Sequence, residues 1–149
     1  MCRFDIYINE IFLTCVQGDG ILISTPTGST AYNLSCGGSI VHDTSDVVCL
    51  TPISAHSLSF RPIILPKSVT IKVVLPQDAR TGAWVTFDGQ MRFKIEKEEQ
   101  LVIQESQYCV PFVKWRSDKS DEAWVTKLKK TLKWNHVKVQ KPLTRIAKL

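Results

Sequence analysis

The stretch that decides the fold is residues 84–95, WVTFDGQMRFKI. It is centred on Asp88-Gly89, a pair suited to the positive φ angles of a tight hairpin turn. Apolar and polar residues alternate beyond the turn, which predicts that the two faces of this hairpin have different surroundings. We expect one set of side chains to face the core: Met91, Phe93 and Ile95. The other set should face water: Arg92, Lys94 and Glu96.

Short strand-like runs lie on both sides of this hairpin. They span residues 4–8, 11–16, 21–25, 47–51, 69–75 and 101–103. Each run is rich in β-branched or aromatic residues, and turn residues such as Pro26 and Pro52 bound them. A parallel sheet would need longer helices between its strands. The sequence therefore predicts an all-β fold: a two-sheet β-sandwich of mostly antiparallel strands with a C-terminal amphipathic helix.

Two segments have a helical pattern. Ser29 or Thr30 can cap a short helix that ends at Gly37-Gly38. A second helix is predicted at about residues 120–134. Its apolar residues recur every four positions and form one stripe among lysines: Trp124, Leu128 and Leu132.

Charge is distributed unevenly along the 149 residues, whose formal net charge is +5. Residues 1–113 hold 8 Lys/Arg and 11 Asp/Glu, whereas residues 114–149 hold 11 Lys/Arg and 3 Asp/Glu. A chain of this length usually forms one domain. We therefore predict a β-sandwich domain over 1–113 and a basic C-terminal segment over 114–149. Such a segment can contact nucleic acid or anionic lipid, although a solvated helix face is commoner.

Apolar runs and cysteines indicate the compartment. The apolar runs are far shorter than a membrane span, and no secretory leader opens the sequence. The five cysteines form no close pair, and the three histidines do not have zinc-site spacing, so we expect no metal site. Buried thiols in a reducing compartment, the cytoplasm, are the simplest interpretation.

The densest polar cluster comprises Gly18-Asp19-Gly20 and residues 24–32, STPTGSTAY. A strand that runs into a Ser/Thr/Gly-rich turn and a helix start offers backbone N–H groups and hydroxyls to an anionic oxygen or a ribose. The turn lacks the Gly-x-x-x-x-Gly-Lys pattern of a P-loop. From these residues alone, ordinary turn and cap chemistry is the more frequent explanation of such a cluster.

Further motifs combine with this cluster into a resemblance. Residues 56–62, HSLSFRP, residues 84–89, WVTFDG, and the Leu132-Lys133-Trp134-Asn135 ending resemble the NAD kinase family in its eukaryotic form. The resemblance covers roughly residues 5–142 and implies the C-terminal, NAD-binding domain. The complete enzyme uses ATP and Mg²⁺ to phosphorylate the adenosine 2′-hydroxyl of NAD, giving NADP. The resemblance further implies a homo-oligomer. The short apolar runs indicate no membrane partner, and the tryptophans of the basic segment fit helix packing better than base stacking, which disfavours a nucleic-acid partner.

The resemblance also implies which residues bind the dinucleotide. Asp19 matches an acidic position that contacts the nicotinamide end, and Gln17 is a weaker match beside it. His56 and Arg61 are expected to be structural, His56 as a partly buried histidine and Arg61 paired with a carboxylate. The NAD-binding positions are Asp19, Thr30, Ala31, Tyr32, Ser35, Ser54 and Gln90.

No catalytic residue is expected in this chain. The family's base is the Asp of a Gly-Gly-Asp-Gly motif in an N-terminal domain, and no such motif occurs here. Asn9-Glu10 matches a variable turn and not the family's ribose-binding Asn-Glu pair. We therefore expect the isolated chain to have little or no kinase activity. Two alternatives are a non-catalytic NAD-binding fragment or paralogue, and an anion- or nucleic-acid-binding module that uses the basic segment.

Overall fold

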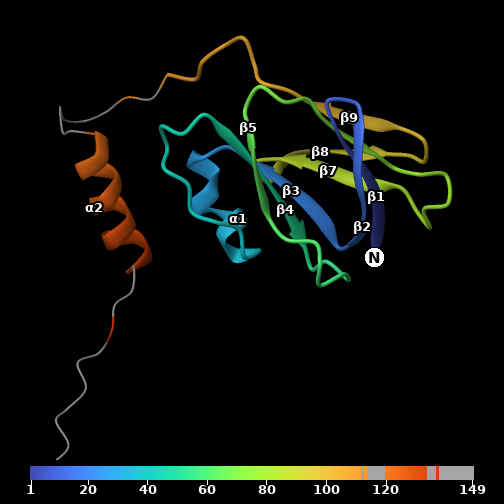
Figure 1. Ribbon diagram of the computed structural model, residues 1–149, viewed down its shortest axis with the longest axis horizontal. Coiled ribbons are helices and arrows are strands. Elements are labelled where there is room, and N and C mark those ends of the chain that lie inside the picture. The colour runs from blue at the N-terminus through green and yellow to red at the C-terminus, as the bar shows by residue number, and fades with distance from the viewer. Residues whose placement is uncertain (112, 114–119, 134–136, 138–149) are drawn as a thin grey trace, which may run out of the picture. The chain divides into compact units, whose positions relative to one another are not determined.

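The computed structural model describes residues 1–111, 113, 120–133 and 137, and it divides the chain into two compact units, Met1–Val110 and Pro111–Leu149 (Figure 1). The first unit consists mainly of strands. These are β1 (Cys2–Ile8), β2 (Ile11–Gly18), β3 (Gly20–Ser24), β4 (Val47–Ile53), β5 (Ile63–Pro66), β6 (Ile71–Val74), β7 (Ala83–Phe87), β8 (Gln90–Ile95) and β9 (Gln100–Ile103). Two short helical turns, η1 (Thr27–Thr30) and α1 (Tyr32–Ser35), connect β3 to β4.

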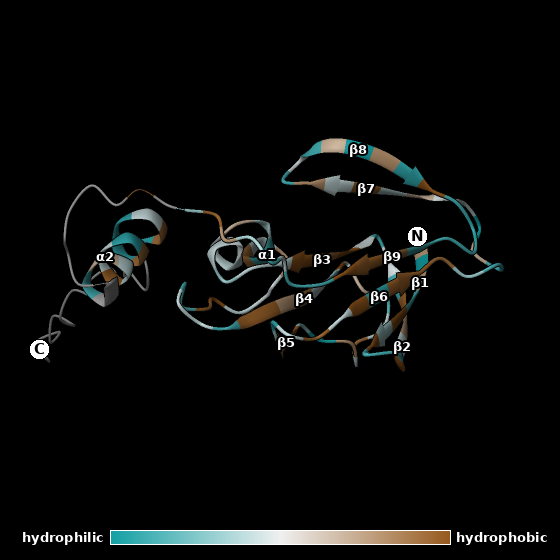
Figure 2. Cartoon of the chain, turned by 90° about the horizontal axis from the view of Figure 1, so that it is seen from above, coloured by the Kyte–Doolittle hydropathy of each residue, from teal (hydrophilic) through white to brown (hydrophobic). Residues whose placement is uncertain are grey.

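The strands form two main sheets and a hairpin (Figures 1 and 2). One sheet has the order β2-β1-β6-β9, the other has the order β3-β4-β5, and β7 pairs with β8. Every described pairing is antiparallel. Both sheets contribute to one core, in which Ile6, Leu50 and Ile71 are almost completely buried. The predicted all-β sandwich is confirmed.

The β7–β8 hairpin has the predicted turn but not all of the predicted burial. Asp88 and Gly89 have φ angles of 49° and 72°, as the tight turn requires. Ile95 lies in the core, whereas Phe93 is 39% exposed and Met91 is 77% exposed, so the prediction for these two residues was wrong. Only the base of the hairpin meets the core. A register shift after Thr86 breaks the alternation near the tip.

Strand β4 continues through Pro52, where we expected it to end. Pro52 pairs with Ile21 of β3 on one side. On the other side, β5 pairs with β4 only as far as Leu50. Because β4 has only one neighbour at Pro52, this position resembles a sheet edge, where proline is tolerated.

The second unit contains helix α2 (Ser120–Leu132). Trp124, Leu128 and Leu132 are the least exposed of its described side chains, as the predicted apolar stripe requires. Lys129 and Lys130 lie in the last turn. The predicted extension to Trp134 lies outside the described residues. No described helix is long and apolar enough to cross a membrane.

Replacing a core residue should test the packing of the two sheets. Leu50 is 0% exposed, and Leu50→Ala should lower the free energy of unfolding by about 3 kcal/mol because it leaves a cavity between the sheets. Urea unfolding followed by circular dichroism measures this change. The matched variant Ile64→Ala, on neighbouring β5, should cost clearly less because Ile64 is half exposed. Equal losses for the two variants would contradict the assigned core.

All five cysteines are free thiols; Cys49 is buried as expected, whereas Cys2, Cys15 and Cys36 are only half-buried and Cys109 is exposed. Burial raises the pKa of the Cys49 thiol and is also the main cause of the raised pKa of Cys15. A raised pKa leaves less reactive thiolate at neutral pH. Iodoacetamide should therefore modify the exposed Cys109 first and Cys49 last, with mass spectrometry reporting the order. Early modification of Cys49 in the folded protein would contradict its placement in β4.

Candidate functional site

The bend between β2 and β3 holds Asp19 beside Ser54. The Asp19 N–H donates to the carbonyl oxygen of Ile53 at 2.9 Å, and the His56 N–H donates to that of Gln17 at 2.8 Å. A Cβ added at Gly18 would lie 2.9 Å from the Ile53 oxygen, so only glycine fits this close approach. Backbone contacts therefore hold the bend, and the Asp19 and Ser54 side chains stay exposed.

Ser54 has a backbone conformation that is unusual for its residue type. Its φ angle is 49°, in the left-handed region where non-glycine residues are uncommon. Such strained residues gather at functional sites, where the surrounding structure holds them in place. Here, the surrounding structure is the pair of backbone hydrogen bonds that joins the 53–56 segment to the bend at 17–19.

The helical turns present four further candidate residues. Ala31, Tyr32 and Ser35 are exposed, and Thr30 is half-buried. At 56% exposure the Tyr32 ring is not a core group, so it is accessible to a ligand. The predicted helix is in fact two turns, and no side chain caps either of them; Pro26 and Ala31 occupy the capping positions. The predicted caps at Ser29 and Thr30 were therefore wrong.

A buried amide fixes these turns on the sheet. Asn33 is 1% exposed, and its Nδ2 donates to the carbonyl oxygens of Ser29 and Ser39, each at 3.0 Å. Its Oδ1 accepts a hydrogen bond from the Thr51 hydroxyl of β4 at 2.6 Å. Because Thr51 pairs with Leu22 in the middle of the β3–β4 ladder, α1 folds back over the sheet and does not extend away from it.

Ser29 and two glycines complete this arrangement. The Ser29 hydroxyl bonds with both the N–H and the carbonyl oxygen of Val41, at 2.9 and 3.2 Å. A Cβ at Gly38 would lie 2.2 Å from the Asn33 Oδ1, so glycine is needed for the chain to pass the buried amide. Gly37, with φ of 80°, allows the chain to leave α1, as the predicted end at Gly37-Gly38 requires.

The structure thus places the seven predicted residues in three groups. Asp19 and Ser54 lie at one end of β3, and η1 begins just after its other end, about 16 Å away for a strand of five residues. The fold of α1 over β4 brings the second group back toward the first. Gln90, the third group, is exposed at the hairpin turn, and none of the described contacts joins it to the other two.

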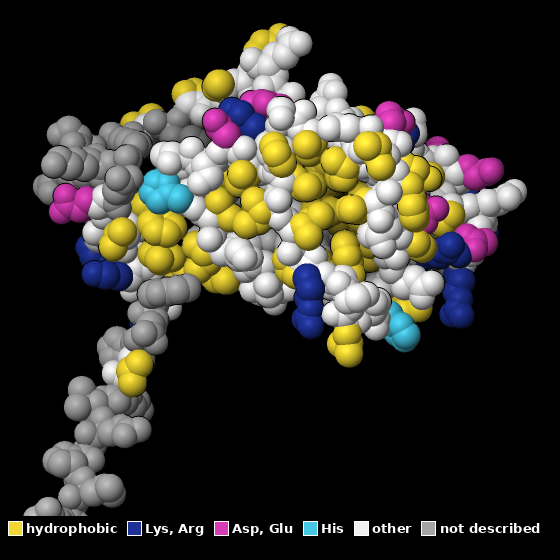
Figure 3. Space-filling model, viewed as in Figure 1, with side chains coloured by type: hydrophobic (Ala, Val, Ile, Leu, Met, Phe, Trp, Pro, Cys, Tyr) yellow, Lys and Arg dark blue, Asp and Glu magenta, His cyan; other side chains and the backbone are white. Residues whose placement is uncertain are grey.

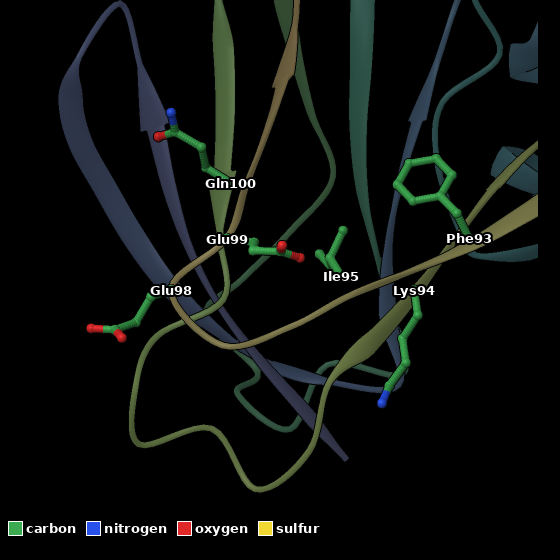
Figure 4. A pocket seen from close by; sticks show the side chains of 6 residues that line it. All are labelled: Phe93, Lys94, Ile95, Glu98, Glu99 and Gln100. Atoms are coloured by element: carbon green, nitrogen blue, oxygen red, sulfur yellow. The ribbon is translucent and has the colours of Figure 1, made fainter.

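A hollow of about 670 Å³ lies elsewhere, between β8 and β9 (Figure 4). None of the seven predicted residues lines it. Its acidic side chains, Glu98 and Glu99, would repel an anionic ligand, and Lys94 is paired with Glu96 at 2.6 Å. The charges of this hollow therefore do not suit a dinucleotide.

Four residues were not predicted to bind NAD, and their surroundings differ: Asn9, Glu10, His56 and Arg61. Asn9 and Glu10 form the β1–β2 turn, where the Asn9 Oδ1 accepts a hydrogen bond from the Thr70 N–H and Glu10 pairs with Lys72. These structural contacts agree with their rejection as ribose ligands. His56 is exposed, not partly buried as expected, and Arg61 has no carboxylate partner among the described residues.

The described part of the chain holds no cluster of three or more His, Cys, Asp or Glu residues that suits a metal ion.

Comparison with known proteins identifies the family. The model of the ATP-NAD kinase C-terminal domain matches residues 1–115, which is most of the chain. The chain belongs to the ATP-NAD kinase family. The resemblance predicted from the motifs is therefore confirmed.

Family relatives share much of the sequence. An uncharacterized kinase of Schizosaccharomyces pombe is 45% identical over 130 residues, which cover 87% of this chain and 33% of that protein. An ATP-NADH kinase of Saccharomyces cerevisiae is 42% identical over 142 residues, or 95% of this chain and 28% of that protein. The chain thus spans about a third of the length of these kinases.

A solved structure of the family has the same fold. The crystal structure of yeast NADH kinase complexed with NADH matches 93% of this chain and 42% of its own, with a TM-score of 0.78 and 28% sequence identity. The likeness supports the β-sandwich fold, and the matched kinase structure contains a bound dinucleotide, NADH.

Sequence reasoning missed Asn33 and Thr51, whose hydrogen bond fixes the helical turns of the candidate site on β4. The available signal was polarity: Thr51 follows the apolar run Val47–Leu50, and Asn33 lies between the apolar positions of a short helix. A polar residue in such a place needs a buried partner. The sequence does not show that the two residues are each other's partners.

Removing the buried amide should loosen the site. Asn33→Ala should lower the free energy of unfolding by about 2 kcal/mol or more, because it leaves the Thr51 hydroxyl and two carbonyl oxygens without their partner. Thermal and urea unfolding measure the loss. The control Ser35→Ala, on the exposed side of the same turn, should change stability little. A neutral Asn33→Ala would contradict the role given to this network.

Proposed function

We propose that this chain is the dinucleotide-binding domain of an NAD kinase. In the complete enzyme, the γ-phosphoryl group of ATP would pass to the adenosine 2′-hydroxyl of NAD and give NADP. The single observation that carries the proposal is the set Thr30, Ala31, Tyr32 and Ser35, which is exposed except for the half-buried Thr30 and is held by the buried Asn33 above β4. Membership of the family and the dinucleotide named for the yeast NADH kinase structure support it.

Each group has a chemical role in this proposal. The Asp19 carboxylate accepts a hydrogen bond from the carboxamide N–H₂ of nicotinamide. The Thr30 and Ser35 hydroxyls and the nearby backbone N–H groups bind ribose or phosphate oxygens, and the exposed Tyr32 ring supplies an aromatic surface. Ser54 and Gln90 add polar contacts from two other segments. A rigid scaffold beneath exposed polar side chains is the arrangement that selective binding requires.

Catalysis needs groups beyond this domain. Phosphoryl transfer depends on alignment of the two substrates and on stabilisation of the transferred charge, with Mg²⁺ bridging the ATP phosphates. We further propose that the enzyme acts as a homo-oligomer, as the family resemblance implies, and that it is cytoplasmic, as its free cysteines suggest.

Calorimetry with NAD tests the binding site. Asp19→Ala should weaken NAD binding about tenfold or more, because a hydrogen bond to a charged group contributes about 1.5–3 kcal/mol. The matched control is Asp46→Ala, which removes an exposed carboxylate at the far end of β4 from Asp19. Asp46 directly precedes that strand, whereas the Asp19 N–H bonds to Ile53, its last residue. Equal affinities for the wild type and Asp19→Ala would refute the assigned role.

A turnover assay tests whether catalysis needs groups outside this chain. The purified 149-residue chain, supplied with NAD, ATP and Mg²⁺, should form no NADP above the background of a protein-free reaction. This result is expected because the presumed base is not in this sequence. Production of NADP by the chain alone would show that a catalytic group lies within it.

A further inference from the structure

Lys67 connects the two main sheets on the side where their last strands end. β5 is the last strand of the three-stranded sheet, and β9 is the last strand of the four-stranded sheet. Lys67 directly follows β5, and its Nζ lies 3.1 Å from a carboxylate oxygen of Glu105, just beyond β9. The same Nζ lies 2.8 Å from a carboxylate oxygen of Asp46, which directly precedes β4. Figure 3 shows acidic and basic side chains gathered near β5 as Figure 1 places it.

The other side of the sandwich is joined by the backbone. β2 and β3 are the first strands of their sheets, and Asp19 alone separates them along the chain. The Asp19 N–H donates to the carbonyl oxygen of Ile53, and the His56 N–H donates to that of Gln17. Within the described residues, no backbone hydrogen bond joins β5 to β9. The polar contact at the ends of these two strands is therefore ionic.

Two other ion pairs differ from this bridge because each stays within one sheet. Arg3 of β1 pairs with Asp78 in the loop after β6, and Lys72 of β6 pairs with Glu10 in the β1–β2 turn. β1 already shares a backbone ladder with both β2 and β6. Those pairs therefore reinforce strands that are joined without them, whereas the bridge at Lys67 joins strands that are not.

Asp46 orders the Lys67 side chain before Glu105 binds it. The Lys67 N–H donates to the Asp46 carbonyl oxygen at 3.1 Å, in addition to the ion pair between their side chains. Hydrogen bonds to Asp46 and Glu105 raise the pKa of Lys67, so the ammonium stays charged at neutral pH. An isolated surface pair contributes little, partly because two long side chains must be ordered for one contact. Here Asp46 has already met part of that cost.

Glu105 anchors the end of β9 before the chain leaves the first unit. Residues 106–111 are exposed, and the hydrogen bond described there, from the Tyr108 N–H to the Ser106 hydroxyl, is local. The second unit begins at Pro111. The contact with Lys67 therefore separates the ordered end of β9 from an exposed connecting segment.

We propose that Lys67 forms an ionic latch with Asp46 and Glu105, which closes the β5–β9 side of the sandwich. Opening of the latch would free β9 from its Ile103 end, nearest Glu105, and leave the β2–β3 side joined. The latch side chains are between 46% and 78% exposed, so dissolved salt screens their attraction. The latch is a salt-sensitive device within the fold, and it does not rest on the proposed NAD binding.

Amide hydrogen exchange in the full 149-residue chain tests the latch. At low salt, Lys67→Met removes the charge but keeps a long side chain. It should speed exchange of the β9 amides that bond to β6 about two- to fivefold, as the loss of a surface ion pair predicts. The amides of β3, on the joined side, should stay unchanged. The matched control Lys97→Met removes an exposed lysine between β8 and β9 and should exchange as the wild type does.

Salt and exchange of charges separate an ionic latch from side-chain packing. In about 1 M salt the Debye length falls to roughly 3 Å, so the wild type should exchange as fast as Lys67→Met. Glu105→Lys should also speed exchange at low salt. Adding Lys67→Glu to it should restore slow exchange, because one ammonium again lies beside two carboxylates. Equal low-salt rates for the wild type and Lys67→Met, or no restoration in the double variant, would overturn the proposal.

NAD calorimetry keeps this result separate from the proposed function. Lys67→Met should bind NAD as the wild type does, because Lys67 is not one of the seven candidate residues. A wild type that fails to bind NAD would contradict the proposed function, and faster β9 exchange in Lys67→Met would still support the latch.

Discussion

The buried Asn33 amide is the contact on which the candidate site depends. It joins two backbone carbonyls of its own loop to the Thr51 hydroxyl in the middle of β4, away from water. A buried amide without these partners would destabilise the fold, so the loop has one low-energy position. Gly38 passes so close to the amide that no larger residue fits there. The position of Thr30 to Ser35 follows from this constraint.

Scaffold and binding groups are separated in this molecule. Backbone hydrogen bonds hold the bend at Asp19 and the segment at Ser54, and the amide network holds α1. The side chains of Asp19, Tyr32 and Ser54 make no described hydrogen bond within the protein and are exposed. Their polar groups therefore meet a ligand without first breaking an internal contact, which lowers the cost of binding.

The sequence predicts local features better than their spatial relations. Strand alternation and the Asp88-Gly89 turn predict the sandwich because short-range physics determines them. Alternation fails at Met91 and Phe93, since the sequence does not say how far the hairpin extends beyond the core. The seven candidate residues came from a family resemblance, and their role stays a prediction. The link between Asn33 and Thr51 is a tertiary contact across 18 residues, which no local pattern encodes.

Chemical-shift mapping of the ¹⁵N-labelled chain during an NAD titration tests the central claim most directly. If the exposed residues around Asn33 form the dinucleotide site, saturable shifts should appear at the amides of 18–20, 30–35, 54 and 90. The amides that line the hollow between β8 and β9, from Glu98 to Gln100, should stay unchanged. Shifts confined to that hollow, or no shifts at high NAD concentration, would contradict the account.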